Sequence, residues 1–386
     1  MKRLIALVIT LIWIPLLSSA QDNSVRARDL GIPFEGTPGP LNAITDVKGV
    51  TVGHETIIRD LDGNGAVRTG VTAILPRGLE SNIKPSFGAY FSLNGNGEMT
   101  GTHWLEESGM LEGPVMITNT HSVGAVHDAT IRWRVEAGEA DSSGFWWSLP
   151  VIAETWDGYL NDINGFHVKT EHAHAALAKA KSGPVAEGNV GGGTGMICHG
   201  FKCGIGTSSR IVSTVDGEFT VGVLVQANYG SRETLRVAGV PVGKHITRDV
   251  AYADELAPSR DVGSIIIVVG TDAPLLPHQM KRLARRAAMG LARNGSFAGN
   301  GSGDIFIAFS TANENASQSG EATTVKMISN DEMGSLFLGT VQATEEAIIN
   351  ALVAAEDMVG HEGRIVKAIN HDELRKVMKD YNRLND

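Results

Sequence analysis

The chain has 386 residues, of which 42% are hydrophobic and 20% charged, so it can bury a large core and is neither disordered nor fibrous. Its length suits one large domain or two ordinary ones. A formal net charge of -10 disfavours nucleic acid as a partner.

The N-terminus has the composition of a secretory signal peptide. Lys2 and Arg3 precede the largely apolar run 4–17, and the small residues Ser18-Ser19-Ala20 follow it. The apolar run is shorter than the roughly 20 residues needed to span a bilayer. We therefore expect cleavage after Ala20, no membrane association, and a periplasmic or secreted protein.

The remaining chain predicts a mixture of helices and strands. Short β-branched runs alternate with glycine-rich turns until about residue 150. Helical patterns follow at about 171–182, 278–293, 340–358 and 372–384, and strands are expected near 220–227, 264–269 and 304–310. The regular alternation of a doubly wound sheet is missing. Residues 231–262 show no strong periodicity and suggest an exposed segment.

Two cysteines, two histidines and a glycine run are candidate ligand sites. Cys198 and Cys203 fit either a local disulfide or two buried thiols. His172 and His174 lie in a pattern typical of a surface helix, so we expect no metal. The glycine run 188–196 lacks the Lys-Ser/Thr ending of a P-loop and does not follow a strand, which favours close backbone packing over nucleotide binding. We expect no cofactor.

A cluster of basic residues on the helix expected after Pro277 indicates a solvated face rather than a phosphate site. Its members are Lys281, Arg282, Arg285, Arg286 and Arg293.

The bond between Gly263 and Ser264 immediately precedes the apolar run 265–269. If the chain were cut there, the Ser264 hydroxyl would be a nucleophile beside its own α-amine, which could act as a base. A Gly-Ser pair alone more often marks an ordinary turn before a strand. Other stretches of the chain decide between these interpretations.

The segment 261–279 around this bond resembles the processing site of the L-aminopeptidase D-Ala-esterase/amidase (DmpA-like) family, which includes the β-aminopeptidases. Further family-like stretches lie at 44–50, 117–124, 154–162, 223–230 and 301–304. The resemblance implies a four-layer αββα sandwich like that of the N-terminal nucleophile hydrolases and ornithine acetyltransferases. It also implies a single catalytic domain, residues 21–386, that cleaves itself into 21–263 and 264–386 and forms a homo-oligomer.

The same resemblance implies a set of catalytic residues. Ser264 is the nucleophile, first attacking the Gly263 carbonyl in an N-to-O acyl shift. Asn228 is the oxyanion-hole donor, since its amide can bind negative charge while staying neutral. Ser302 and Asp304 match a second serine and the acid two residues after it. The family often has Glu at this last position, so we expect the hydrogen bond by which the shorter Asp304 supports Ser302 and Ser264 to be longer or water-bridged.

Two residues are implied in substrate binding. Glu154 matches the acid that receives the free ammonium group of the substrate, which would confine the enzyme to N-terminal residues. Trp156 stands where the family commonly has Tyr, so a hydroxyl donor is lost near the site. Taken alone, a salt-bridged structural role would be the default for Glu154.

We therefore expect a self-processing serine aminopeptidase that releases small α- or β-amino residues from peptides, amides or esters with a free amino group. The alternatives are an ornithine acetyltransferase-type acyl transferase and an uncut periplasmic binding protein of the same fold. A Ser-His-Asp triad with His121 or His127 is a further rival, but no Gly-x-Ser-x-Gly elbow surrounds Ser264 or Ser302.

Overall fold

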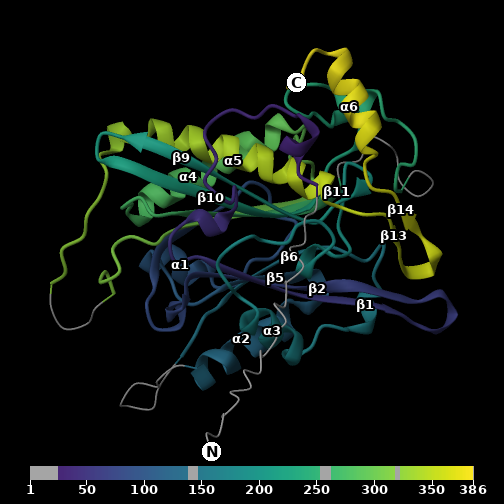
Figure 1. The fold of residues 1–386 in the computed structure, drawn as a ribbon. Helices are drawn as coiled ribbons and strands as arrows, with labels where there is room; N and C mark the ends of the chain where they lie inside the picture. Colours follow the sequence, from purple (N-terminus) through teal and green to yellow (C-terminus); the bar gives the residue numbers. More distant parts are fainter. Residues whose placement is uncertain (1–24, 138–146, 253–261, 318–321, 386) are drawn as a thin grey trace, which may run out of the picture.

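The computed structural model describes residues 25–137, 147–252, 262–317 and 322–385 and consists of four layers (Figure 1). Two facing sheets form the middle layers, and helices cover the outer face of each. The predicted αββα sandwich is confirmed. The expected signal peptide, residues 1–20, lies outside the described residues.

The larger sheet has six strands in the order β4-β3-β12-β11-β10-β9. Their bounds are β3 Ser86–Ser92, β4 Met110–Leu111, β9 Ile205–Thr214, β10 Gly217–Asn228, β11 Val262–Thr271 and β12 Gly301–Ser310. Strands β11 and β12 run parallel, while β10 pairs antiparallel with β11. Alternate residues of β11 serve two cores: Ile265 and Ile267 pack toward the helices, and Ile266 and Val268 pack between the sheets.

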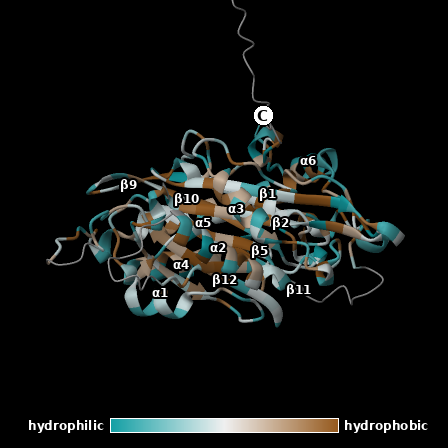
Figure 2. Cartoon of the chain, turned by 90° about the horizontal axis from the view of Figure 1, so that it is seen from below, coloured by the Kyte–Doolittle hydropathy of each residue, from teal (hydrophilic) through white to brown (hydrophobic). Residues whose placement is uncertain are grey.

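The smaller sheet has four strands in the order β1-β2-β5-β6. Their bounds are β1 Thr51–Asp60, β2 Ala66–Leu79, β5 Val115–Asn119 and β6 Val151–Thr155. A third core of buried side chains lies between this sheet and helices α2 (Val123–Ala137) and α3 (Thr170–Ala178). Figure 2 shows this sheet in view from below, with strongly apolar strands behind a more polar helical layer.

Helices α4 (Pro277–Arg293) and α5 (Gly334–Val353) cover the six-stranded sheet. The remaining elements are α1 (Thr102–Ser108), α6 (His371–Asp380), and the two-stranded pairs β7 (Ile197–Cys198) with β8 (Phe201–Lys202) and β13 (Met358–Val359) with β14 (Ile365–Val366). Among the described residues, no helix is both long and apolar enough to cross a membrane.

The predicted helices and strands after residue 170 are present with shifted ends; α5, for example, begins at Gly334 rather than 340. The expectation of strands alone before residue 150 is wrong, because α1 and α2 lie in that part. The β-branched residues of α2 hid its helical pattern. The segment 231–252 is also not simply exposed, since Leu235 and Val242 are completely buried.

The glycine run packs against backbone, as its composition predicted. A Cβ on Gly193 would lie 2.5 Å from the Ile205 nitrogen, and one on Gly195 would lie 2.3 Å from the Arg68 carbonyl oxygen. Neither position can carry a side chain without movement of the main chain. Of the two open alternatives for the cysteines, the structure has the disulfide between Cys198 and Cys203.

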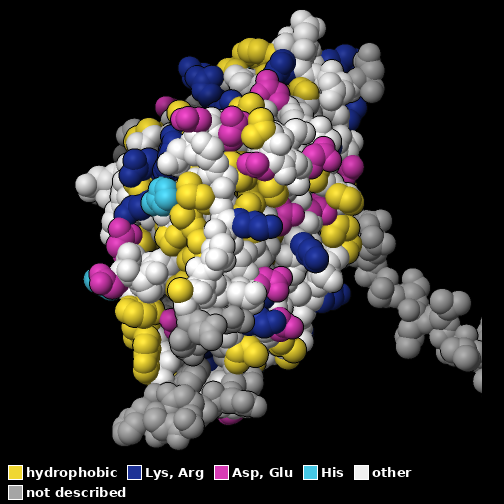
Figure 3. Space-filling model, turned by 90° about the vertical axis from the view of Figure 1, so that its left-hand side faces the viewer, with side chains coloured by type: hydrophobic (Ala, Val, Ile, Leu, Met, Phe, Trp, Pro, Cys, Tyr) yellow, Lys and Arg dark blue, Asp and Glu magenta, His cyan; other side chains and the backbone are white. Residues whose placement is uncertain are grey.

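Several basic residues of α4 form ion pairs or pack on an aromatic ring, whereas a solvated face was expected. Lys281 pairs with Glu106, Arg293 pairs with Glu345, and the guanidinium of Arg286 lies 3.9 Å from the centroid of an aromatic ring, that of Phe337. Figure 3 shows the molecule from the left-hand side of Figure 1, where charged and apolar side chains are interleaved.

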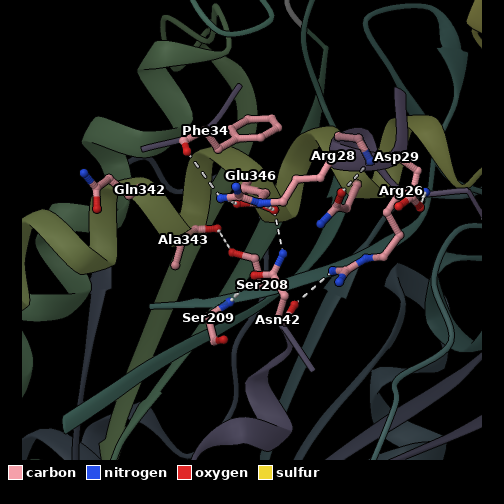
Figure 4. A network of polar contacts seen from close by, with 12 residues as sticks. Arg26, Arg28, Asp29, Phe34, Asn42, Ser208, Ser209, Gln342, Ala343 and Glu346 are labelled. Atoms are coloured by element: carbon pink, nitrogen blue, oxygen red, sulfur yellow. Dashed lines mark hydrogen bonds and ion pairs between the residues drawn. The ribbon is translucent and has the colours of Figure 1, made fainter. Parts of the chain in front are cut away.

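A buried ionic network ties the N-terminal segment to α5 (Figure 4). The completely buried carboxylate of Glu346 accepts hydrogen bonds from Arg28 at 2.7 Å and from Arg210 of β9 at 2.6 Å. Asn42 donates a third bond, at 2.6 Å. Burial by itself would raise the pKa of Glu346, but the two arginines outweigh it and hold the pKa below its ordinary value.

Candidate active site

Ser264 lies near the start of β11, where the register sets it directly opposite Asn228 of β10 and Gly303 of β12. Its side chain is on the same face of the strand as Ile266, which faces the smaller sheet. The hydroxyl is nearly buried, with 5% of the residue exposed, and its Oγ accepts a hydrogen bond from the Gly303 N–H at 3.1 Å. The expected nucleophile is therefore held at the end of a rigid strand pair.

Gly263 is fixed by close packing against β10. Its φ angle is +125°, and a Cβ there would lie 1.9 Å from the Asn228 carbonyl oxygen. Both the backbone conformation and this contact require glycine. The residue before Ser264 is thus small because the neighbouring strand occupies the space of a side chain.

Ser302 and Asp304 form a direct pair at the start of β12. Ser302 Oγ donates to Asp304 Oδ1 at 2.6 Å, and both residues are buried. The longer or water-bridged bond expected from the shorter side chain of Asp304 is wrong for this pair. Gly303, between them, supplies the N–H that reaches Ser264.

Asn94 holds Asp304 by two hydrogen bonds and was missed in the sequence. Its Nδ2 donates to Asp304 Oδ2 at 3.3 Å, and its Oδ1 accepts from the Asp304 N–H at 2.6 Å. Asn94 lies in the glycine-rich loop after β3, where an Asn by itself predicts only a turn. The repeated Asn-Gly sequence at residues 94–97 is the one feature of the sequence that could have drawn attention to Asn94.

The side-chain amide of Asn228 is buried and held at both ends. Its Oδ1 accepts from the Ile197 N–H at 2.9 Å, and its Nδ2 donates to the Trp156 carbonyl oxygen at 2.9 Å. These partners determine which end of the amide is the donor. In the described part of the chain one of the two Nδ2 hydrogens is used in this way, and the second suits an oxyanion.

Glu154, at the end of β6, has a buried carboxylate that is bonded only by neutral donors in the described part of the chain. Oε1 accepts from the Glu98 N–H at 2.9 Å, and Oε2 accepts from the Thr120 hydroxyl. Burial raises the pKa of Glu154 above its ordinary value, although these two bonds lower it. The default of a salt-bridged structural carboxylate does not hold, because the partners of Glu154 among the described residues are a backbone N–H and a hydroxyl rather than a Lys or Arg.

Gly97 connects Glu154 to the serine. A Cβ on Gly97 would lie 3.1 Å from Gly303 Cα and 3.4 Å from Glu154 Oε1. Since Gly303 also contacts Ser264 Oγ, the carboxylate and the hydroxyl belong to one site. The loop after β3 therefore spans the site, with Asn94 on one side and the Glu98 N–H on the other.

Trp156 contributes to this site through its backbone carbonyl, which accepts from Asn228. The residue is 42% exposed, and its indole packs over Gly158, where a Cβ would lie 2.6 Å from the ring. The ring of the rival base His121 stacks on Phe166 with a centroid distance of 6.0 Å. The rival Ser-His-Asp triad gains no support from this contact.

Comparison with known proteins agrees with this arrangement. The model of the family described as "Peptidase family S58" matches residues 42–366. The chain belongs to this family. A β-peptidyl aminopeptidase BapA from Sphingosinicella microcystinivorans is 53% identical over 383 residues, covering 96% of each chain. A second BapA, from Sphingosinicella xenopeptidilytica, is 48% identical and covers 96% of this chain and 95% of that one.

Solved structures of S58-like proteins superpose on nearly the whole chain. The L-aminopeptidase D-Ala-esterase/amidase from Ochrobactrum anthropi, described as a variant of the Ntn hydrolase fold, has a TM-score of 0.87 and 50% identity, covering 93% of this chain and 99% of that one. A β-aminopeptidase from Burkholderia sp. has a TM-score of 0.83 and 48% identity, covering 92% and 99%. The resemblance to the DmpA-like family is thereby confirmed.

Proposed function

We propose that this S58 protein is a self-processing aminopeptidase and amidase that uses Ser264 as its nucleophile. The observation that carries the proposal is the meeting of three groups at one site: a hydroxyl at the start of β11, the fixed amide of Asn228 opposite it, and the buried Glu154 carboxylate bonded by neutral donors. Hydrolysis of small N-terminal residues needs a nucleophile, an oxyanion donor and an ammonium acceptor. These three groups can supply those functions.

Maturation begins with the uncut bond. Ser264 Oγ attacks the Gly263 carbonyl carbon, the C–N bond breaks, and Gly263 becomes esterified to Ser264. Water then hydrolyses the ester, which leaves a carboxylate on Gly263 and a free α-amine on Ser264. Close packing of Gly263 against the Asn228 backbone restricts the movement of this residue.

Turnover uses the new amine. The α-amine takes the Ser264 Oγ proton as Oγ attacks the substrate carbonyl, and it returns the proton to the leaving group. Water then hydrolyses the acyl-serine ester, which releases the substrate's acyl part as an acid and regenerates the Ser264 hydroxyl. Asn228 Nδ2 donates to the oxyanion of the tetrahedral intermediate. In the parallel register Ser302 is opposite Gly263 and Gly303 is opposite Ser264, which supports a role for the neighbouring Ser302–Asp304 pair in orienting the new amine.

Glu154 selects the substrate by charge. Burial destabilises the charged form of the Glu154 carboxylate, so an ion pair with a substrate ammonium would stabilise it more than the neutral donors do. An interior peptide bond carries no ammonium group and cannot form this ion pair. The relatives named for β-peptidyl and L-amino substrates support a site that accepts small α- or β-amino residues. The acyl-transferase and binding-protein alternatives are not favoured by these relatives.

Export and assembly complete the proposal. The apolar N-terminal run supports cleavage after Ala20 and a periplasmic or secreted location. We also propose a homo-oligomer of processed units, to be tested by light scattering on a sizing column.

Intact-mass measurement of the purified protein beside a Ser264→Ala variant tests the proposal. Wild type should give the fragments 21–263 and 264–386, and Ser264→Ala should stay uncut and inactive. A single uncut wild-type chain, or turnover by Ser264→Ala, would contradict the proposed nucleophile.

A further inference from the structure

Lys202 is a completely buried amine that the catalytic cycle above does not use. It lies in β8, and its Nζ donates to two backbone carbonyl oxygens, those of Met196 at 3.0 Å and Cys203 at 2.5 Å. No carboxylate of the described residues pairs with it, and burial lowers its pKa well below the usual value for lysine. Burying an amine in this way costs free energy, which raises the question of what it does.

The Met196–Ile197 peptide group connects Lys202 to the oxyanion amide. Its C=O accepts from Lys202 Nζ and from the Cys203 N–H, both at 3.0 Å. Its N–H donates to Asn228 Oδ1 at 2.9 Å. A donor on the carbonyl of a peptide group polarises it and strengthens its N–H as a donor. Lys202 is therefore one peptide group away from Asn228.

The surrounding hairpin makes this connection rigid. The Cys198–Cys203 disulfide closes the β7–β8 pair, and His199 N–H donates to the Tyr229 carbonyl, next to Asn228, at 2.8 Å. A shift of the Met196–Ile197 peptide group would remove the donor that keeps Asn228 Oδ1 turned away from the serine. The amide could then present oxygen instead of N–H to the oxyanion.

We propose that Lys202 is a positioning residue for the oxyanion hole, acting on Asn228 through the Met196–Ile197 peptide group. This inference rests on the proposed function, in which Ser264 attacks and Asn228 stabilises the oxyanion. It assigns a role to a side chain that contacts neither the serine nor the substrate.

The test compares Lys202→Met with wild type in kcat, KM and melting temperature. Loss of one oxyanion donor typically costs 10² to 10³ in kcat, so misorientation of the amide should cost roughly ten- to a hundredfold. KM should stay within about twofold, because the oxyanion exists only after attack. If Lys202→Met does not accumulate, Lys202→Gln, which keeps an N–H donor on a shorter chain, should show a smaller loss of kcat.

Arg232→Met is the matched control. Arg232 is also a buried cation that donates to backbone carbonyls of this hairpin, those of His199 and Gly200, but not to Met196. This variant should lower the melting temperature and keep kcat. A loss of kcat as large as that of Lys202→Met would make the effect merely structural and would overturn the proposal.

A double-mutant cycle with Asn228→Ala decides the route of action. In the Asn228→Ala background, Lys202→Met should cause no further loss of kcat; if Asn228→Ala cleaves itself too slowly to yield mature enzyme, the slow rates of self-cleavage of the single and double variants are compared instead. If the losses of kcat in the two single variants multiply in the double variant, or if Lys202→Met leaves kcat unchanged, the inference about Lys202 is overturned and the proposed function is not. Activity in Ser264→Ala would instead overturn the proposed function.

Discussion

Two buried glutamates of this protein are held in opposite ways. Glu346 receives two arginines and an asparagine, and its pKa is lowered; Glu154 receives a hydroxyl and a backbone N–H, and its pKa is raised. Both carboxylates lose their water, but only Glu346 is compensated by charges of the same chain. The comparison shows that Glu154, unlike Glu346, has no lysine or arginine partner among the described residues, which is why we propose it as the acceptor of a substrate ammonium.

The largest expected effect is on stability at Glu346. Glu346→Ala leaves Arg210 buried without its carboxylate and should cost about 3–5 kcal/mol in the free energy of unfolding, measured by urea denaturation. Asp60→Ala is the control, because Asp60 pairs with Arg68 but is 84% exposed and should matter by less than about 1 kcal/mol. Similar losses in the free energy of unfolding of the two variants would contradict the structural role of the buried Glu346 carboxylate.

Glu154→Gln should affect activity and spare stability. Loss of a charged hydrogen-bond partner is worth about 1.5–3 kcal/mol, so kcat/KM for a substrate with a free amine should fall by roughly ten- to a hundredfold. An ester whose amine is acylated provides the control, since wild type and variant should hydrolyse it equally slowly. A fall in stability like that of Glu346→Ala would assign Glu154 a structural role.

Acidification should act on the two glutamates with opposite signs. The folded pKa of Glu346 is lowered, so its contribution to stability is present above its unfolded pKa and is lost as pH falls through the folded pKa. The folded pKa of Glu154 is raised, so its burial destabilises the fold above that pKa and the penalty is relieved as pH falls. Melting temperatures between about pH 6 and 3 should thus fall less in Glu346→Gln and more steeply in Glu154→Gln than in wild type.

Thr120→Val should give the smallest effect. The Thr120 hydroxyl lowers the pKa of Glu154, so its removal should raise that pKa further. The pH dependence of KM for an amine substrate should move upward accordingly. A downward movement would contradict the proposed hydrogen bond.

The fold could be predicted, and the residues of the proposed site could be named, because they lie in stretches recognisable along the chain. The supporting residues could not. Asn94, Thr120 and Lys202 act through partners 210, 34 and 6 residues away in sequence, and each is an ordinary turn or strand residue until the sheets bring its partner near. Helix α2 was missed for a local reason, since its valine, threonine and isoleucine residues favour strands when tertiary packing is unknown.

The Arg28–Glu346 pair also bears on how the chain folds as it is made. The two residues are 318 positions apart, so the carboxylate that anchors the first described turn is synthesised near the end. Contacts of such separation form late, after the entropy of closing a long loop has been overcome. During synthesis Arg28 consequently stays without its α5 partner until that helix has emerged, whereas Glu187, the partner of Arg26, is made earlier.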